Sequence, residues 1–242
     1  METLLIITAA VLWGCGTGVL IPRPAYRFSV PPEEPWRSVC PAGHPLTGTG
    51  GWLGRARCAA GDTFGPSTLA AAFATAVVCV LLATTTSARP ELVVWLLLVP
   101  AGVLLAAVDF TAHRLPDVLT LPLAAAALVL LGVAAMLPSA GGSWTSALLG
   151  SLILGACYFV LFLLSKGFGF GDVKLALALG AVLGWYGWAI VVVGTFAGYL
   201  LGALYGIVLI VTGRDSRKTR IPFGPFLLAG AFAGVLLGSC TR

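Results

Sequence analysis

Recurring apolar runs of membrane-spanning length limit the fold of this sequence more than any other feature. A helix needs about 20 consecutive apolar residues to cross a bilayer, and eight such windows follow one another along the chain. They lie at residues 3–21, 68–86, 91–109, 117–137, 145–165, 172–185, 187–212 and 222–239, of which the sixth is the shortest. Backbone polar groups inside a bilayer must be bonded internally. The runs therefore predict an all-α polytopic membrane protein with about eight transmembrane helices.

The composition agrees with this class. Hydrophobic residues make up 59% of the 242 residues and charged residues only 10%, whereas soluble domains carry about 25% charged residues. The net charge of +5 is dispersed along the chain, where Lys and Arg set topology and meet anionic lipid. We therefore expect the lipid bilayer as a partner and no nucleic acid. Because Glu2 rather than a basic segment precedes the first run, we expect a retained helix and not a cleavable signal peptide.

One polar segment, rich in Pro and Gly, interrupts the apolar pattern at residues 22–67. It is too long for a tight connection and too poor in apolar residues to cross the bilayer. The sequence thus predicts a first transmembrane helix at 1–21, a small subdomain at 22–67 and a membrane-embedded domain at 68–242.

The positions of the Lys and Arg residues test which side of the membrane each connecting segment occupies. If residues 22–67 are cytoplasmic and the chain alternates sides, twelve basic residues fall in the cytoplasm and only Arg89 and Arg242 on the other side. Such an excess is typical of cytoplasmic loops. The segments then predicted to be cytoplasmic are 22–67, 110–116, 166–172 and 213–221. We expect a multi-pass protein of the cell inner (cytoplasmic) membrane, with its N-terminus outside.

This topology brings two carboxylates to one membrane face. Asp109 stands in "AAVDFTAHRLPD", where the third span ends, and Asp172 stands in "GFGFGDVK", where the sixth begins. An ionised Asp inside a bilayer costs about 2.5–3.5 kcal/mol on insertion scales, which argues for a functional role. Two adjacent carboxylates share a proton, so one can activate water while the other polarises a carbonyl. The glycines beside Asp172 would let a substrate backbone approach closely.

Structural roles for the same residues are the alternative. Asp172 opens a helix, where Asp is a good N-cap, and Asp117 in "LPDVLT" is interpreted as the N-cap of the fourth span. His113 and Lys174 are interpreted as interfacial solvated groups, although Lys174 is near enough in sequence to act on the carboxylates electrostatically. The glycines do not form a phosphate-binding G-x-G-x-x-G loop, because Asp172 occupies the third glycine position and no strand precedes them.

Three segments together resemble one family. "GFGFGDVK" resembles the GxGD signature of type IV prepilin peptidases, which are polytopic membrane aspartic proteases, and "VDFTAHRLPDVLTLP" resembles their other catalytic segment. "IPFGPFLLAGA" matches a further family segment that leads into the last helix. The resemblance implies catalytic roles for Asp109 and Asp172, with Gly169 and Gly171 as signature glycines and Lys174 as support of the loop.

The resemblance also implies a substrate class. Family members cleave the short basic leader from prepilin or pseudopilin precursors at the cytoplasmic face of the membrane, and proteolysis by the two aspartates requires no cofactor. The main rival is a proton-coupled transporter that relays protons through intramembrane carboxylates. It would be favoured by inverted repeats with broken helices, which the sequence does not show. A second rival is an inactive membrane scaffold in which the aspartates are helix caps.

The N-terminal segment departs from the fuller members of the family. Those members carry two CxxC pairs, typical of a zinc site, whereas Gly43 and Gly61 here replace the second cysteines in "CPAGHPL" and "RCAAGDTFG". The residues left to form a weak Cys-His-Cys-Asp site are Cys40, His44, Cys58 and Asp62. The alternative, two reduced cytosolic thiols without metal, is the one that we expect.

The methyltransferase half of the family is also incomplete. Fuller members methylate the new N-terminus with S-adenosylmethionine, and a G-S-F-L-N-V-like segment at the first span belongs to that activity. The corresponding stretch here, "GCGTGVLIPRPAYR", lacks the Asn. The missing Asn puts methylation, and with it S-adenosylmethionine as a cofactor, in doubt and leaves the resemblance to the proteolytic half unaffected.

Overall fold

The computed structural model describes residues 1–31, 33–58, 61–165, 169–212 and 222–241. The described residues form helices and no strand, apart from two isolated β-bridges in the segment before residue 67. The α-helices are α1 (Glu2–Gly18), α2 (Pro22–Phe28), α3 (Thr68–Thr86), α4 (Glu91–Ala112), α5 (Asp117–Ala135), α6 (Trp144–Leu164), α7 (Phe170–Gly184), α8 (Trp188–Val211) and α9 (Phe223–Cys240). A helix stands at each of the eight predicted runs. The prediction of an all-α polytopic membrane protein is confirmed.

Six helices, α3, α4, α5, α6, α8 and α9, are long and apolar enough to cross a membrane. The pair α1 and α2, bent by 42° at their junction, makes a seventh if it is one broken span. The helix at the sixth predicted run, α7, has 15 residues. At 1.5 Å per residue it is about 22 Å long, which is short of the hydrocarbon core of about 30 Å.

The short helix α7 lies inside the bundle. Most of its apolar side chains are buried, and it packs against α5, α6 and α9. Small residues allow the closest approach, because a Cβ at Gly180 would collide with the carbonyl of Gly150 on α6. Since its neighbours cover it, α7 can carry a carboxylate at its N-terminus without exposing it to lipid.

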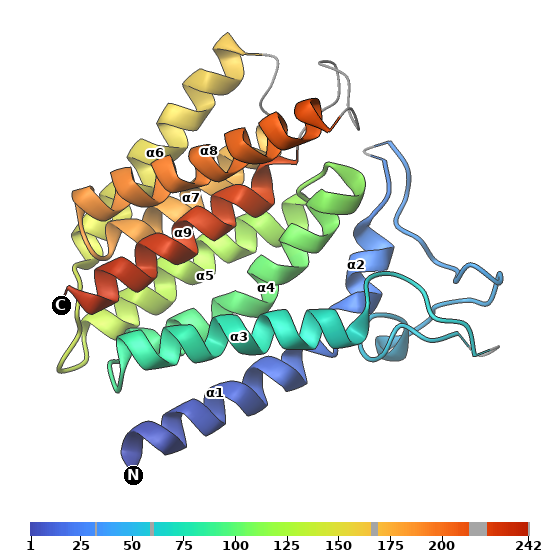
Figure 1. The fold of residues 1–242 in the computed structure, drawn as a ribbon, viewed down its shortest axis with the longest axis horizontal. Coiled ribbons are helices and arrows are strands. Elements are labelled where there is room, and N and C mark those ends of the chain that lie inside the picture. The colour runs from blue at the N-terminus through green and yellow to red at the C-terminus, as the bar shows by residue number, and fades with distance from the viewer. Residues whose placement is uncertain (32, 59–60, 166–168, 213–221, 242) are drawn as a thin grey trace.

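The two ends of the helix bundle carry different parts of the chain (Figure 1). The start of α1 and the end of α9 lie at one end, whereas the segment between α2 and α3 projects from the other. Arg114, in the turn between α4 and α5, donates a hydrogen bond to the Pro31 carbonyl at 3.1 Å, so this turn lies beside the projecting segment. The arrangement therefore groups two segments that were predicted to share the cytoplasm. Residues 166–168 and 213–221, also predicted there, lie outside the described residues.

Aromatic and cationic side chains join α2 to the projecting segment. Phe28 packs against Trp36 and Trp52 with ring centroids 5.1 and 5.2 Å apart, and the Arg27 guanidinium lies 3.8 Å from the Trp52 ring centroid. Arg27 also donates to the Leu46 carbonyl at 2.9 Å. The first part of the predicted subdomain is helix α2, which continues from α1 after the bend.

Candidate active site

Asp109 is buried near the end of α4, with 5% of its surface exposed. The helix ends three residues later because His113 adopts a left-handed conformation, with φ 50°, while its amide donates to the Asp109 carbonyl at 2.9 Å. The Asp109 Oδ2 accepts the backbone amide of Gly224 at 2.9 Å. Gly224 is the second residue of α9, where amides have no partner within the helix and the helix dipole favours a negative charge.

Asp172 is buried at the start of α7, with 8% of its surface exposed. Its Oδ2 accepts the amide of Gly169 at 2.9 Å, and its own amide donates to the Gly169 carbonyl at 3.0 Å. Gly169 is therefore the N-cap residue, and Asp172 supports the cap from the third helical position. The prediction that Asp172 is itself the N-cap is therefore wrong, although its carboxylate does accept the amide of the N-cap residue.

Leu115 joins the two carboxylate-bearing segments. A Cβ at Gly171 would lie 2.9 Å from the Leu115 Cβ, and one at Gly224 would lie 3.2 Å from the Leu115 Cδ2 and 2.8 Å from Asp109 Oδ2. Both glycines are thus needed for the close approach of α7 and α9 to the turn between α4 and α5. The carboxylates of Asp109 and Asp172 interact electrostatically, as expected of groups that meet at one end of the bundle.

No described contact joins Lys174 to Asp109 or Asp172. Its Nζ lies 2.6 Å from Asp117 Oδ1 and 4.6 Å from the Phe170 ring centroid. The expectation that Asp117 is an N-cap is wrong, because Pro116 is the N-cap of α5 and Asp117 begins the helix with no side-chain capping bond. The side chain of Asp117 is 63% exposed and turns to Lys174, so this ion pair ties α5 to α7 beside the site.

A pair of tyrosines, which the sequence did not single out, completes the surroundings of Asp172. Tyr158 on α6 and Tyr199 on α8 stack with ring centroids 6.0 Å apart, and Tyr199 meets Phe223 at 6.2 Å. Both tyrosines interact electrostatically with Asp172. Aromatic residues are common in apolar spans, so no local pattern marked these two. Tyr158 is buried and Tyr199 half-buried, so these rings lower the local dielectric, which strengthens the interaction between charges.

Cys40, His44 and Cys58 come together in the projecting segment. The His44 Nδ1 lies 3.6 Å from the Cys40 Sγ and 3.0 Å from the Cys58 Sγ, and the three ligand atoms lie within 4.8 Å of one another. The carboxylate of Asp62 is not part of this group, which corrects the expected four-residue set. Asp62 instead accepts the Cys58 amide through its backbone carbonyl at 2.7 Å.

The two cysteines stand in equivalent turns. The Gly43 amide donates to the Cys40 carbonyl at 2.9 Å and the Gly61 amide to the Cys58 carbonyl at 3.0 Å, and both glycines have positive φ. Structural zinc takes four tight ligands, and the described residues supply three. The cluster therefore has one ligand fewer, among the described residues, than two CxxC pairs would supply.

The geometry of the cluster alters the acidity of one thiol. Burial opposes ionisation of Cys40, but hydrogen bonds from Cys58, from the His44 side chain and from backbone amides outweigh it and lower the pKa of Cys40 to about 7. Thiolates are the reactive and metal-binding form of cysteine, so this thiol is partly ionised near neutral pH.

The fold and the site define a class, a polytopic helical membrane protein with two buried, electrostatically coupled aspartates at one end of its bundle. Comparison with known proteins identifies the family. Residues 96–207, which include both aspartates, match the type IV leader peptidase family. The prepilin leader peptidase/N-methyltransferase of Aeromonas hydrophila is 34% identical over 234 residues, which cover 92% of this chain and 77% of that protein. The chain belongs to the type IV leader peptidase family.

Other relatives align over shorter regions. The protein of the same description from Aeromonas salmonicida (strain A449) is 38% identical over 150 residues, which cover 61% of this chain and 50% of that protein. The one from Pseudomonas putida is 35% identical over 138 residues, which cover 55% and 46%. The chain thus spans about half the length of these two curated relatives. No solved structure is significantly similar to this chain.

Proposed function

We propose that this protein is a membrane aspartic endopeptidase that removes the leader from type IV prepilin or pseudopilin precursors at the cytoplasmic face of the inner membrane. One observation carries the proposal. Asp109 and Asp172 are buried at the same end of the bundle, interact electrostatically, and each accept a glycine amide. The relatives described as prepilin leader peptidases support it. Membership of a peptidase family gives no support to the transporter alternative.

In the proposed mechanism the two carboxylates share one proton, because ionising both at close range is unfavourable. The ionised carboxylate takes a proton from water, and the water oxygen attacks the scissile carbonyl. The protonated carboxyl gives its proton to the carbonyl oxygen, which leads to a neutral tetrahedral diol. The carboxyl that received the water proton then protonates the leaving amine, and the other carboxylate recovers the diol proton as the carbonyl re-forms.

The glycine amides have a definite part in this scheme. The amide of Gly224 fixes Oδ2 of Asp109, and the amide of Gly169 fixes Oδ2 of Asp172. The other oxygen of each carboxylate then faces the chemistry. Amides that are fixed by a helix N-terminus need no reorganisation during the reaction, which favours catalysis. In this scheme proteolysis uses no metal, since the aspartates supply both acid and base.

The location of the site suits the proposed substrate. A prepilin-like precursor has a basic leader and then an apolar helix, and the bond to be cleaved lies at their boundary. A dyad at the end of a membrane bundle would meet that boundary while the helix stays in lipid and the leader stays in the cytoplasm. The division into a first span at 1–21, a subdomain at 22–67 and a peptidase domain at 68–242 is part of this proposal.

We further propose that methylation is weak or absent. The relatives' description includes an N-methyltransferase, but the first span here lacks the expected Asn and the cysteine cluster has three ligands among the described residues. The test is incubation of purified protein in detergent with a prepilin precursor and S-adenosylmethionine, read by product mass. We expect the mature, unmethylated mass. An uncleaved precursor would contradict the peptidase, and an added methyl group that depends on this protein would contradict the second proposal only.

A further inference from the structure

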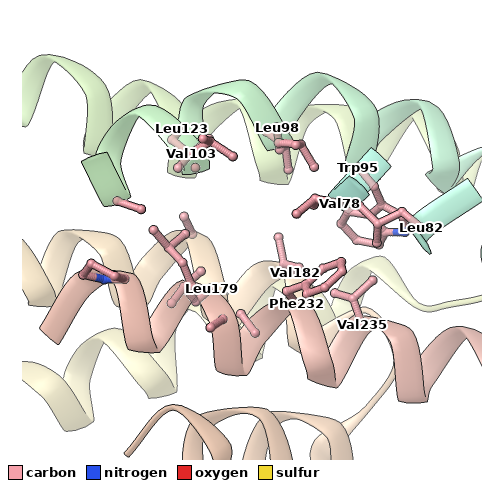
Figure 2. Close-up of a pocket in the computed structure, with 18 residues that line it drawn as sticks. Val78, Leu82, Trp95, Leu98, Val103, Leu123, Leu179, Val182, Phe232 and Val235 are labelled. Carbon is pink, nitrogen blue, oxygen red and sulfur yellow. The ribbon is translucent and has the colours of Figure 1, made fainter. Parts of the chain in front are cut away.

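An elongated cavity of about 290 Å³ lies between α3, α4, α7 and α9. Figure 2 shows side chains from opposite walls that point into it, among them Leu98 and Val103 from α4, Leu179 and Val182 from α7, and Phe232 and Val235 from α9. Neither the aspartates nor the proposed mechanism uses this space. We propose that it is a binding site for one acyl chain of a bilayer phospholipid.

The wall of the cavity contains no group that could satisfy a polar ligand. The lining residues are aliphatic or aromatic apart from glycine and proline, and the one side-chain polar atom among them, Nε1 of Trp95, already donates to the Tyr186 hydroxyl at 3.2 Å. Water needs two to four polar partners to occupy a buried site. An extended peptide would leave its amides and carbonyls unpaired here. The ligand must therefore be hydrocarbon.

The length and width of the cavity distinguish a single acyl chain from a transmembrane helix. On α9 the wall runs from Pro225 to Val235, which at 1.5 Å per residue is about 15 Å. Spread over this length, 290 Å³ open to the centre of a water molecule gives a mean cross-section of about 20 Å², or about 50 Å² once a water radius of about 1.4 Å is added all round, whereas a helix 10–12 Å across needs about 80–110 Å². A transmembrane helix, including the apolar helix of a precursor, does not fit. A single unbranched chain does.

The cavity is also continuous with the lipid-facing surface. Most of its lining positions lie in the middle turns of α3, α4 and α9, which are long enough to cross a membrane, and only Pro225 stands near a helix start, so its mouth lies mainly at the depth of the hydrocarbon core. Ala229 at its edge is exposed, as are Val77 and Leu81 beside the lining residues Val78 and Leu82. Acyl chains are thus the hydrocarbon in contact with the mouth. This inference does not depend on the proposed proteolysis.

Quenching of Trp95 by brominated lipid tests the proposal. Trp95 lines the cavity but is only 2% exposed, so bromine on an acyl chain reaches its ring only from inside. The protein is reconstituted in phosphatidylcholine vesicles with brominated or plain chains, and the Trp95 signal is the emission of wild type minus that of Trp95→Phe. We expect at least half of that signal to be quenched in brominated vesicles. An unquenched Trp95 would overturn the proposal.

A matched pair of variants on α4 provides the control. The nearest atom to a Cβ at Gly102 is the Leu228 Cδ2 at 3.5 Å, so the side chain of Gly102→Phe has room to enter the cavity. Leu97→Phe adds the same ring at a position 44% exposed to lipid. Quenching of Trp95 should fall at least twofold in Gly102→Phe and stay unchanged in Leu97→Phe. Equal quenching in both would place the lipid outside the cavity. A Trp95 signal that responds to a prepilin precursor and not to brominated lipid would assign the cavity to the substrate instead.

If Gly102→Phe does not fold, Gly102→Leu takes its place, and the wild-type measurement alone still decides between a filled and an unfilled cavity.

Discussion

The backbone amide of Gly224 donates a hydrogen bond to Oδ2 of Asp109 at 2.9 Å, across 115 positions of sequence. The last helix therefore takes part in the site that holds the first aspartate. It does so through its backbone, at the glycine of the "IPFGP" segment. Pro222 is the N-cap of α9 and Gly224 its second residue, so an unpaired helical amide points at the carboxylate.

Replacement of Gly224 by alanine should reduce cleavage sharply. The new Cβ would stand 2.8 Å from Oδ2 of Asp109, so either the carboxylate or α9 must move and the hydrogen bond is lost. A hydrogen bond to a charged group contributes about 1.5–3 kcal/mol, which predicts a fall of about 10- to 150-fold in kcat/KM for a prepilin precursor. The control is Gly202→Ala on α8, where the nearest atom is a Phe223 side-chain carbon at an ordinary 3.4 Å. Equal activity of the two variants would contradict a role for the Gly224 amide.

Asp109→Asn and Asp172→Asn should each abolish cleavage nearly completely. Asparagine keeps the shape of the side chain but neither accepts nor gives a proton at the pH of the reaction, and general acid–base catalysis contributes about 10²- to 10⁴-fold. Asp117→Asn is the matched control. It removes the charge of Asp117, whose side chain is 63% exposed while that of Lys174 is 14% exposed. Ion pairs that reach solvent contribute about 0–1 kcal/mol to stability, and no described contact joins Asp117 to either proposed catalytic aspartate, so turnover should stay near normal. An inactive Asp117→Asn beside an active Asp109→Asn would reverse the assignment.

The fold was largely predictable from sequence because the length of an apolar run is a local property. A helix occupies each predicted run, and the shortest run became the shortest bundle helix, α7. The bend between α1 and α2 was not predicted. It falls just before Pro22, the first residue of α2, and a proline restricts the residue before it and favours a helix boundary, so a local signal existed that we did not interpret.

The site was predictable only in part. Alternation of the spans and the excess of Lys and Arg predicted that Asp109 and Asp172 share one membrane face, and the structure buries both at one end of the bundle, where their charges interact. The contact of Leu115 with the positions of Gly171 and Gly224 arises from tertiary packing and left no signal in sequence. Asp117 was wrongly predicted to be an N-cap, because an Asp before an apolar run usually caps the helix. Here its side chain instead pairs with Lys174 on α7, a contact that the sequence around Asp117 does not record.

The cysteine cluster should lose a thiol proton at a lower pH than an ordinary cysteine does. Because hydrogen bonds lower the pKa of Cys40 to about 7 from an ordinary value of 9.0, the thiolate is present above about pH 7 and is lost as the pH falls through that value. Thiolate ultraviolet absorbance should therefore show a step near pH 7 that is absent from Cys40→Ser. The neighbouring Cys58 shares a hydrogen bond with Cys40, so the step belongs to the pair.

His44→Ala should shift this step upward, since it removes one of the hydrogen bonds that favour the thiolate. A step that stays near pH 7 in His44→Ala would show that the imidazole has no part in lowering the pKa, and a wild-type step near pH 9 would contradict the cluster geometry itself.

The topology is open to a direct test with two introduced cysteines. Arg55 lies in the projecting segment, and Met136 follows the far end of α5; both side chains are exposed. Since twelve of the 14 Lys and Arg fall on the side assigned to the projecting segment, that side should be the cytoplasm. The background replaces the exposed Cys15, Cys157 and Cys240 with serine, and also Cys40 and Cys58, because the thiols of the cluster lie in the same segment as Arg55. In intact cells with a permeable outer envelope, a membrane-impermeant maleimide should label Met136→Cys and not Arg55→Cys. After the inner membrane is opened, both should react. Labelling of Arg55→Cys alone in intact cells would invert the topology and would put the proposed active site on the wrong side for a cytoplasmic leader.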